Sequence, residues 1–363
     1  MFRIARFSAL LWAGFFLTGC GSDTPAPAEP GPFDAAADVS AEDVADSASD
    51  GAESGPADSS VEAGALALRP DVTIDTYPRV DGATSSLPLA MVIACELLGL
   101  PWKWTDGWDE ESQDYIRNVT PDPRTPDQVV LAAQVVEKIV HHKTYKAYLR
   151  LIEDQTDLIV VASLPSLEEA QYAAEVGVTL SARPIALDAL VFLVNGENPV
   201  SGLTTEQIRD IYLGDTRRWS EVGGLDSEIH PYVRPTNAGS QQLMDTLVMD
   251  GLSMPLWPPD HEMQAMGEWT NSLMADPDAI GYSSYYYMTH MVSAERLKTI
   301  GVDGEDPTAP TVRTKTYPYT AEVWVVTRSN LPRDSVAGQL SNWLLSSDGQ
   351  GVVWLSGYVP VRM

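Results

Sequence analysis

The chain has 363 residues, of which 51 are acidic and 23 are Lys or Arg, and its formal net charge at pH 7 is −28. This excess of negative charge makes nucleic acid and anionic membrane surfaces unfavourable partners. Only two cysteines are present, so a disulfide framework is excluded as the organising element of the fold.

The first twenty residues have the pattern of an export signal. Arg3 and Arg6 form a positive start, a short apolar run follows at 9–17, and the sequence Leu-Thr-Gly-Cys that ends at Cys20 resembles a bacterial lipobox. The apolar run is too short to span a bilayer comfortably. We therefore expect a lipoprotein signal peptide at residues 1–19, with plain secretion as the alternative. Lipidation of Cys20 would anchor the protein in the cell envelope, in the periplasm or at the outer membrane or cell surface, and the lipid would be its only membrane contact.

The segment after the cysteine is acidic and nearly free of large apolar side chains. Residues 21–68 contain eleven acidic side chains and no Lys or Arg. Such a segment cannot bury enough surface to offset its chain entropy, so we expect residues 20–68 to form a disordered acidic tether behind the lipidated cysteine. Residues 69–363 still carry 40 acidic and 21 basic side chains. A small anion would therefore need a local pocket that works against the overall field.

The first polar segment of the folded part precedes an apolar run. Asp81-Gly82 predicts a tight turn, the hydroxyls of Thr84–Ser86 follow, and residues 87–98 are apolar over a length that predicts a buried helix. Hydroxyls and free backbone N–H groups at a helix start suit an oxyanion. An ordinary Ser/Thr helix cap is the alternative. The lone Cys95 in the helix is interpreted as a small buried hydrophobe.

Strands and helices alternate along the rest of the chain. Continuous apolar strands between helices favour the α/β class, with sheets covered on both faces. Two lobes with a cleft between them fit this length better than one barrel does. Strands are expected at 157–162, 189–194 and 321–326, and helices are expected to begin at Ser166, Thr204 and Ser335.

A second polar segment spans residues 231–244. Arg234 ends a predicted strand, a glycine-containing turn follows, and Ser240 and Gln241 open a helix. The planar guanidinium of arginine grips an oxyanion through two parallel hydrogen bonds. Pairing of Arg234 with a surface carboxylate is the alternative. Two such segments, one in each predicted lobe, would face each other across the cleft.

These segments together resemble the phosphate-binding-protein-like substrate-binding proteins of ABC transporters, over about residues 70–363. The most specific part of the resemblance is 194–212 followed by 219–224. It implies the two-lobed type II periplasmic-binding-protein fold, in which each lobe is a mixed sheet flanked by helices and the ligand cleft lies between them. Lobe 1 would comprise residues 69–186 and 318–363, and lobe 2 residues 187–317. Further matching segments are 77–89, 141–148, 157–169, 280–283 and 357–360.

The resemblance also implies which residues bind the anion. In two places the sequence departs from the family pattern: Ala238 stands where the family has a serine, and the family's aspartate has no counterpart near Ser163. A buried carboxylate favours an anion that still carries a proton, so its loss leaves sulfate and small organic anions open beside phosphate. The implied ligand-binding residues are Thr84, Ser85, Ser86, Thr144, Ser163, Arg234, Gly239, Ser240 and Gln241.

The expected function is that of a solute-binding lipoprotein that binds phosphate, or a similar oxyanion, for uptake through ABC permease subunits. We expect a monomer with no cofactor, no metal site and no catalytic residues. A surface adhesin or sensor on the same fold is an alternative, and so is a hydrolase, although none of the five histidines lies in a ligand-spaced motif.

Tyr285–Tyr287 are interpreted as strand residues that could wall the cleft. Trp102, Trp104 and Trp108 lie in an insertion that forms either a surface patch or a packed loop.

Overall fold

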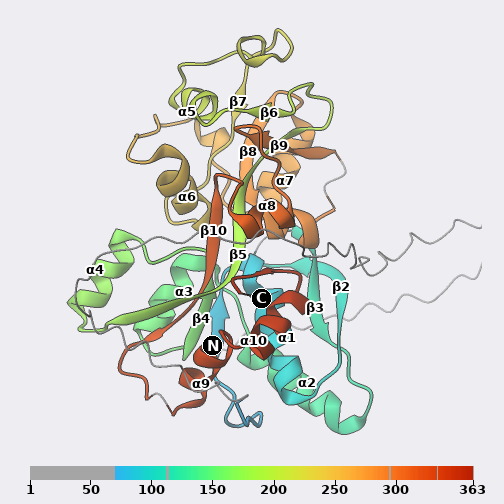
Figure 1. Ribbon diagram of the computed structural model, residues 1–363, viewed down its shortest axis with the longest axis vertical. Helices are drawn as coiled ribbons and strands as arrows, with labels where there is room; N and C mark the ends of the chain where they lie inside the picture. Colours follow the sequence, from blue (N-terminus) through green and yellow to red (C-terminus); the bar gives the residue numbers. More distant parts are fainter. Residues whose placement is uncertain (1–69, 112–113, 294–295, 333, 363) are drawn as a thin grey trace, which may run out of the picture. The chain divides into compact units, whose positions relative to one another are not determined.

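The computed structural model describes residues 70–111, 114–293, 296–332 and 334–362. The predicted signal peptide, the lipidation site at Cys20 and the acidic tether lie outside these residues. Within the described part, none of the helices combines the length and the apolar character that a membrane span requires. The helices and strands form an α/β fold of two lobes that are joined through one long strand (Figure 1).

The first lobe contains the strands at one end of a mixed sheet, in the order β1–β4–β10–β5. β1 and β4 are parallel, whereas β10 is antiparallel to both of its neighbours. The strands are β1 (Val80–Gly82), β4 (Leu158–Val161), β10 (Thr320–Arg328) and the first part of β5 (Leu180–Asn195). The helices are α1 (Leu87–Leu98), α2 (Pro126–Lys138), α3 (Lys143–Ile152), α4 (Leu167–Glu175), α9 (Val336–Trp343) and α10 (Ser347–Leu355).

The second lobe continues the sheet from the other part of β5. β8 and β9 are antiparallel to β5, and the short strands β7 and β6 pair with β8 and β9 in parallel. The strands are β6 (Gly202–Leu203), β7 (His230–Pro231), β8 (Ala279–Ser284) and β9 (Leu297–Val302), and β11 (Val359–Pro360) pairs with β5 near the crossing. The helices are α5 (Thr205–Leu213), α6 (Gly239–Leu243), α7 (Met266–Ala275) and α8 (Ala309–Thr314).

β5 is the strand that both lobes share. Residues 180–189 pair with β10, and residues 190–194 pair with β8. The predicted strand at 189–194 is therefore confirmed, but it is only the second part of a 16-residue strand. The first residues, from Leu180 to Pro184, are partly exposed and chemically mixed, so they lack the apolar run that signals a buried strand.

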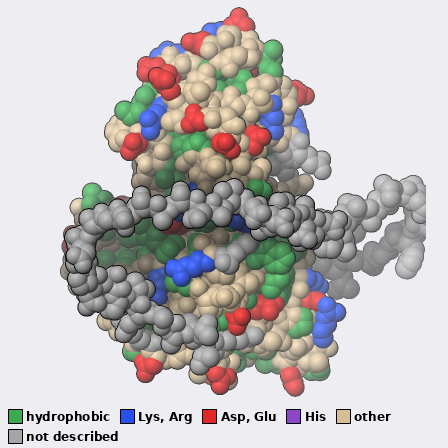
Figure 2. Space-filling view, viewed as in Figure 1, with side chains coloured by type: hydrophobic (Ala, Val, Ile, Leu, Met, Phe, Trp, Pro, Cys, Tyr) green, Lys and Arg blue, Asp and Glu red, His purple; other side chains and the backbone are tan. Residues whose placement is uncertain are grey.

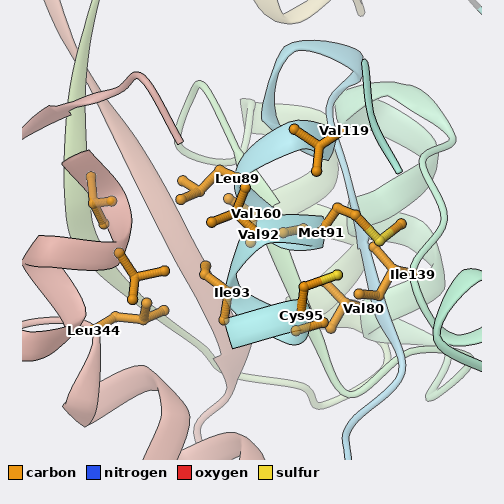
Figure 3. Close-up of a cluster of buried hydrophobic side chains, with 14 of the residues drawn as sticks. Val80, Leu89, Met91, Val92, Ile93, Cys95, Val119, Ile139, Val160 and Leu344 are labelled. Carbon is orange, nitrogen blue, oxygen red and sulfur yellow. The ribbon is translucent and has the colours of Figure 1, made fainter. Parts of the chain in front are cut away.

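Two large clusters of buried side chains fill the two lobes. In the first, α1 packs between the strands and the C-terminal helices; Figure 3 shows its Leu89, Ile93 and Cys95 between β-strand side chains and Leu344. The predicted buried thiol is confirmed, and burial raises the pKa of Cys95 to about 12. Members of the second cluster come from residues 187–321 and Val359. The first cluster also contains Tyr286, Tyr287 and Met291, and the second contains Tyr319 and Ala321, so the lobe boundaries at 186/187 and 317/318 stay a prediction.

Local signals for helices agree with the structure. The predicted helix at 87–98 is confirmed, and it ends at Gly99, which has the left-handed φ of 67°. Ser166 and Thr204 each cap a helix through a capping box, as their sequences predict. The helix predicted from Ser335 is also confirmed, with that serine as its N-cap.

Three local predictions are wrong or incomplete. Asp81-Gly82 is not a turn: both residues lie in β1, and glycine is required because a Cβ at Gly82 would lie 2.2 Å from the Val160 carbonyl oxygen. Tyr285–Tyr287 do not form a strand, because β8 ends at Ser284 and the chain turns into a helical segment. The tryptophan-containing insertion is a β-hairpin of β2 (Trp102–Asp109) and β3 (Asp114–Pro121).

Candidate functional site

A cavity of about 270 Å³ lies between the lobes and is lined by residues of both. Side chains of the first polar segment and of the start of α3 form one wall, and the segment that leads into α6 forms the opposite wall. Three of the predicted ligand-binding residues do not line this cavity: Ser86, Ser163 and Gln241. The six that do are Thr84, Ser85, Thr144, Arg234, Gly239 and Ser240.

The first wall is formed by the 3₁₀ turn η1 (Thr84–Ser86) between β1 and α1. No side chain caps α1, so the alternative of an ordinary Ser/Thr cap is wrong here. The Ser86 hydroxyl instead donates to the carbonyl oxygens of Ala83 and Val160, which explains why it points away from the cavity. The Tyr358 hydroxyl donates to the Ser85 carbonyl oxygen at 2.9 Å and fixes the turn from behind. Thr84 and Ser85 are left facing the cavity.

Asp81, at the end of β1, joins this turn to the start of α3. Its side chain is fully buried and ion-pairs with Arg150, whose Nε lies 2.7 Å away. It also accepts hydrogen bonds from the backbone N–H groups of Gly82 at 2.8 Å and His142 at 3.0 Å, and His142 Nδ1 lies 2.8 Å from its other oxygen. A buried carboxylate with this many donors is compensated, so it can position two segments that lie 61 residues apart.

A second histidine contacts the Thr84 hydroxyl. His141 Nδ1 lies 3.5 Å from Thr84 Oγ1, and His141 Nε2 lies 2.8 Å from an oxygen of Asp109 at the end of β2. The hairpin therefore contributes to the site by orienting an imidazole behind the threonine. Both histidines lie at the start of α3 and contact aspartates, as expected of residues that pack a helix start. The described residues contain no group of three or more His, Cys, Asp or Glu side chains arranged to hold a metal.

Thr144 and Gly239 bring the two walls into contact. Thr144 is buried at the second position of α3, and a Cβ on Gly239 would lie 2.6 Å from its Oγ1. The glycine is therefore required by close approach rather than by its backbone angles. Ser163 lies behind this contact, where its hydroxyl donates to Gln242 Oε1 at 2.6 Å. Ala162 lines the cavity in its place, so this part of the wall offers no carboxylate.

Arg234 is the most deeply buried cation of the cavity, with 5% of its surface exposed. Its backbone N–H donates to Gln241 Oε1 at 3.1 Å and to the Tyr282 hydroxyl at 3.2 Å. The Gln241 amide also donates to Asp245 at 2.9 Å. Gln241 is therefore part of the frame that holds the arginine backbone, and its amide does not reach the cavity. Burial raises the pKa of Tyr282, which keeps its hydroxyl protonated within this frame.

The charges that line the cavity differ from those of the surface. Figure 2 shows Asp and Glu side chains scattered over the visible face of the described residues, with Lys and Arg side chains among them. In contrast, the described residues that line the cavity include Lys143, Lys146 and Arg234 but only one carboxylate, that of Glu111. Local positive charge in an acidic protein is the arrangement that a small anion requires. The two lysines and Glu111 were not predicted, although Lys143 directly precedes the predicted Thr144.

Comparison with known families identifies the chain. Residues 134–348 match the PBP superfamily domain. The chain belongs to the PBP superfamily. The phosphate-binding protein PstS of Bacillus subtilis is 26% identical over 181 residues, which are 49% of this chain and 56% of that protein. PstS of Borreliella burgdorferi is 25% identical over 187 residues, which are 49% of this chain and 64% of that protein. The aligned segments thus span less than two thirds of the length of these relatives.

Two solved structures share the fold of this chain. A substrate-binding protein from Clostridium perfringens, solved with bound phosphate, superposes with a TM-score of 0.56 at 20% identity and covers 78% of this chain and 99% of that one. An ABC-type phosphate transport receptor from Vibrio cholerae gives a TM-score of 0.52 at 20% identity, with 77% and 98% covered. At this identity the likeness establishes the two-lobed fold, as the sequence resemblance predicts.

Proposed function

We propose that the protein is an extracytoplasmic solute-binding lipoprotein that binds one tetrahedral oxyanion, with phosphate as the first candidate, in the cavity between its lobes. The observation that carries this proposal is the position of Arg234, a cation with 5% of its surface exposed that lines a cavity bordered by hydroxyl side chains from both lobes. A buried guanidinium forms strong, charge-assisted hydrogen bonds to an oxyanion, which supplies a negative charge beside it. The names of the PstS relatives support phosphate as that charge.

Each lining residue has a role in this proposal. The Arg234 guanidinium would hold two oxygens of the anion, because its planar fork matches the spacing of an oxyanion. Thr84, Thr144 and Ser240 would donate their hydroxyls, and Ser85 would donate its backbone N–H. Gly239 would let the two walls approach closely enough for one small ligand to contact both. Ser86, Ser163 and Gln241 would act indirectly, by holding the backbone that carries these donors.

The transport role rests on the relatives and on the N-terminal sequence. Relatives named phosphate-binding proteins support delivery of the ligand to an ABC permease. Cys20 lies outside the described residues, so its lipidation is tested separately. We expect wild-type protein to incorporate labelled fatty acid in cells and Cys20→Ser to lose the label and leave the membrane fraction. A Cys95→Ser variant is the matched control and should keep the label. Label retained in Cys20→Ser would contradict the lipid anchor.

Calorimetry with phosphate and sulfate tests the binding site. Arg234→Ala should weaken binding by about 2–5 kcal/mol, or roughly 30- to several-thousand-fold, because it removes one member of a buried charge pair. Ser240→Ala should cost about 1–2 kcal/mol, because one hydroxyl donor of several is lost. Arg218→Ala is a suitable control, since Arg218 pairs with Asp226 on the surface and should not affect binding. Unchanged affinity in Arg234→Ala would exclude this cavity, and a preference for sulfate would exclude phosphate as the main ligand.

A hydrolase remains the alternative that one observation favours, because Thr84, His141 and Asp109 form a chain of hydroxyl, imidazole and carboxylate. We expect binding without turnover. Incubation of the protein with p-nitrophenyl phosphate should release no p-nitrophenol above the rate of the Thr84→Val variant. Release that depends on both Thr84 and His141 would instead assign an enzymatic activity to the same cavity.

A further inference from the structure

Lys143 has a backbone conformation that its side chain does not favour. It is the first residue of α3, and its φ of 65° lies in the left-handed region. Four other described non-glycine residues have positive φ, but three are aspartates, which tolerate this region, and none of the four lines the cavity. A glycine would occupy this position without strain. Strained residues of this kind cluster at functional sites, where the surrounding structure holds them in place.

Lys143 is a cation of the cavity lining that belongs to none of the ion pairs between described residues. It lines the cavity and is partly buried, and no carboxylate of the described residues forms an ion pair with it. Other cations nearby are paired: Arg150 Nε lies 2.7 Å from Asp81, and Lys146 Nζ lies 3.7 Å from Glu111. Burial lowers the pKa of Lys143, the charge of Glu111 opposes this, and the positive charge of Arg234 lowers it further.

Lys143 and Arg234 belong to opposite walls of one cavity. Lys143 begins α3 in the first lobe, and Arg234 follows β7 in the second lobe. The two cations repel each other across the cavity, and the carboxylate of Glu111 offsets this repulsion at Lys143. An anion bound between them would attract both cations. The second negative charge of a dianion would then be matched by a second cation rather than by hydroxyl donors alone.

Resting on the proposed oxyanion site, we propose that Lys143 contacts the bound ligand as its second cationic partner and that the site therefore selects tetrahedral oxyanions with two negative charges. The left-handed backbone at Lys143 is then retained because it places the ammonium group in the cavity. Lys143 becomes a specificity-determining residue, and the ligand class is the dianions, such as phosphate above neutral pH, rather than singly charged oxyanions of similar size.

The test compares two probes in variants at two lysines. Phosphate at pH 8 is mainly a dianion, and hypophosphite is a tetrahedral phosphorus oxyanion with one charge. Lys143→Gln and Lys143→Gly should each weaken phosphate binding at least about tenfold and hypophosphite binding less than about threefold. Lys315 provides the matched control, because it also has a left-handed φ of 57° but pairs with Glu322 away from the cavity. Lys315→Gln and Lys315→Gly should bind both probes as the wild type does.

Unfolding in urea separates strain from binding. In the absence of ligand, Lys143→Gly should unfold at a higher urea concentration than Lys143→Gln, because glycine removes the backbone strain. Greater stability combined with weaker phosphate binding would support a strained binding residue.

If wild-type protein binds phosphate and both Lys143 variants bind it equally well, the inference is overturned while the proposed function stands. If the variants weaken both probes by the same factor, selection for dianions is overturned. If wild-type protein binds neither phosphate nor sulfate, the proposed function fails and this inference fails with it.

Discussion

Gly239 of α6 lies so close to Thr144 of α3 that a Cβ on the glycine would come within 2.6 Å of the threonine Oγ1. Thr144 is buried and cannot move aside without disturbing the start of α3. We therefore expect Gly239→Ala to push the two walls of the cavity apart. Overpacking of this kind typically costs about 1–3 kcal/mol, so phosphate binding should weaken roughly 5- to 150-fold in calorimetry.

Gly351→Ala is the control for that substitution. Gly351 lies in α10, and a Cβ there would meet no atom within 4 Å. Alanine in a helix is favoured over glycine by roughly 1 kcal/mol, so this variant should be at least as stable as the wild type and should bind phosphate normally. Normal binding by Gly239→Ala would instead show that the two walls need not approach this closely.

Asp81 should be the main determinant of stability at the base of the site. Asp81→Asn removes the charge that Arg150 and the His142 side chain face, and it leaves the arginine without its ion-pair partner. Removing one partner of a buried pair costs about 3–5 kcal/mol, although Arg150 is partly exposed, so we expect the lower part of this range. The measurement is the free energy of unfolding from urea titration.

Asp226→Asn is the comparison for Asp81→Asn. Asp226 pairs with Arg218 at 2.8 Å, but its side chain is largely exposed, so its loss should not change stability measurably. An equally small effect at Asp81 would show that burial does not strengthen the pair with Arg150.

Local chemistry explains which parts of the structure the sequence predicts. The helix at 87–98 has an apolar run, and Ser166 and Thr204 begin helices through hydrogen bonds that reach only three residues ahead. Such signals do not depend on the rest of the fold. The first part of β5 has no such signal, because its pairing with β10 joins residues more than 130 positions apart.

The sequence predicts the candidate site only in part, again because some features depend on the rest of the fold. Arg234 and Thr144 were predicted because their residue types and neighbours resemble a known pattern, and the structure places both at the cavity. Ser163 and Gln241 were also expected at the ligand, Ser163 at the place of the family's aspartate, but their side chains bond to Gln242 and to the Arg234 backbone. Which way a polar side chain points depends on its tertiary partners, and a single sequence does not contain them. Lys143 was missed because nothing in the sequence indicates a left-handed backbone at a lysine.

Asp188, in the middle of the shared strand β5, should make stability depend on pH. Burial raises the pKa of this carboxyl to about 6, although backbone N–H groups of Tyr286 and Ala189 oppose the shift. Between about pH 4 and 6 the folded protein therefore holds a proton that the unfolded chain has released. Because this proton is bound on folding, Asp188 contributes to the free energy of unfolding. That contribution is complete below pH 4, and as the pH rises to about 6 it is lost, by up to about 3 kcal/mol.

Comparison with Asp188→Asn isolates this contribution. The amide oxygen of asparagine can still accept from the Ala189 and Tyr286 N–H groups, but the side chain cannot ionise. The difference in unfolding free energy between wild type and Asp188→Asn should therefore shift in favour of the variant as pH rises from 4 to 6. Burial also raises the pKa of Glu169, but this residue is present in both proteins, so its contribution cancels in the difference between their unfolding free energies. A difference that does not change with pH would contradict the assignment to Asp188.

His141 should influence anion binding through the Thr84 hydroxyl alone. Its Nδ1 lies 3.5 Å from Thr84 Oγ1, its Nε2 is held by Asp109, and its side chain is largely buried, so the imidazole can restrict the direction of the hydroxyl. We expect His141→Phe to weaken phosphate binding by about 0.5–1.5 kcal/mol, or roughly 2- to 12-fold, the contribution of one hydrogen bond. Thr84→Val should have an effect of at least this size. In the double variant the two losses should not add, because without the hydroxyl the imidazole has nothing to orient. Additive losses would show that His141 acts on the ligand by a separate route.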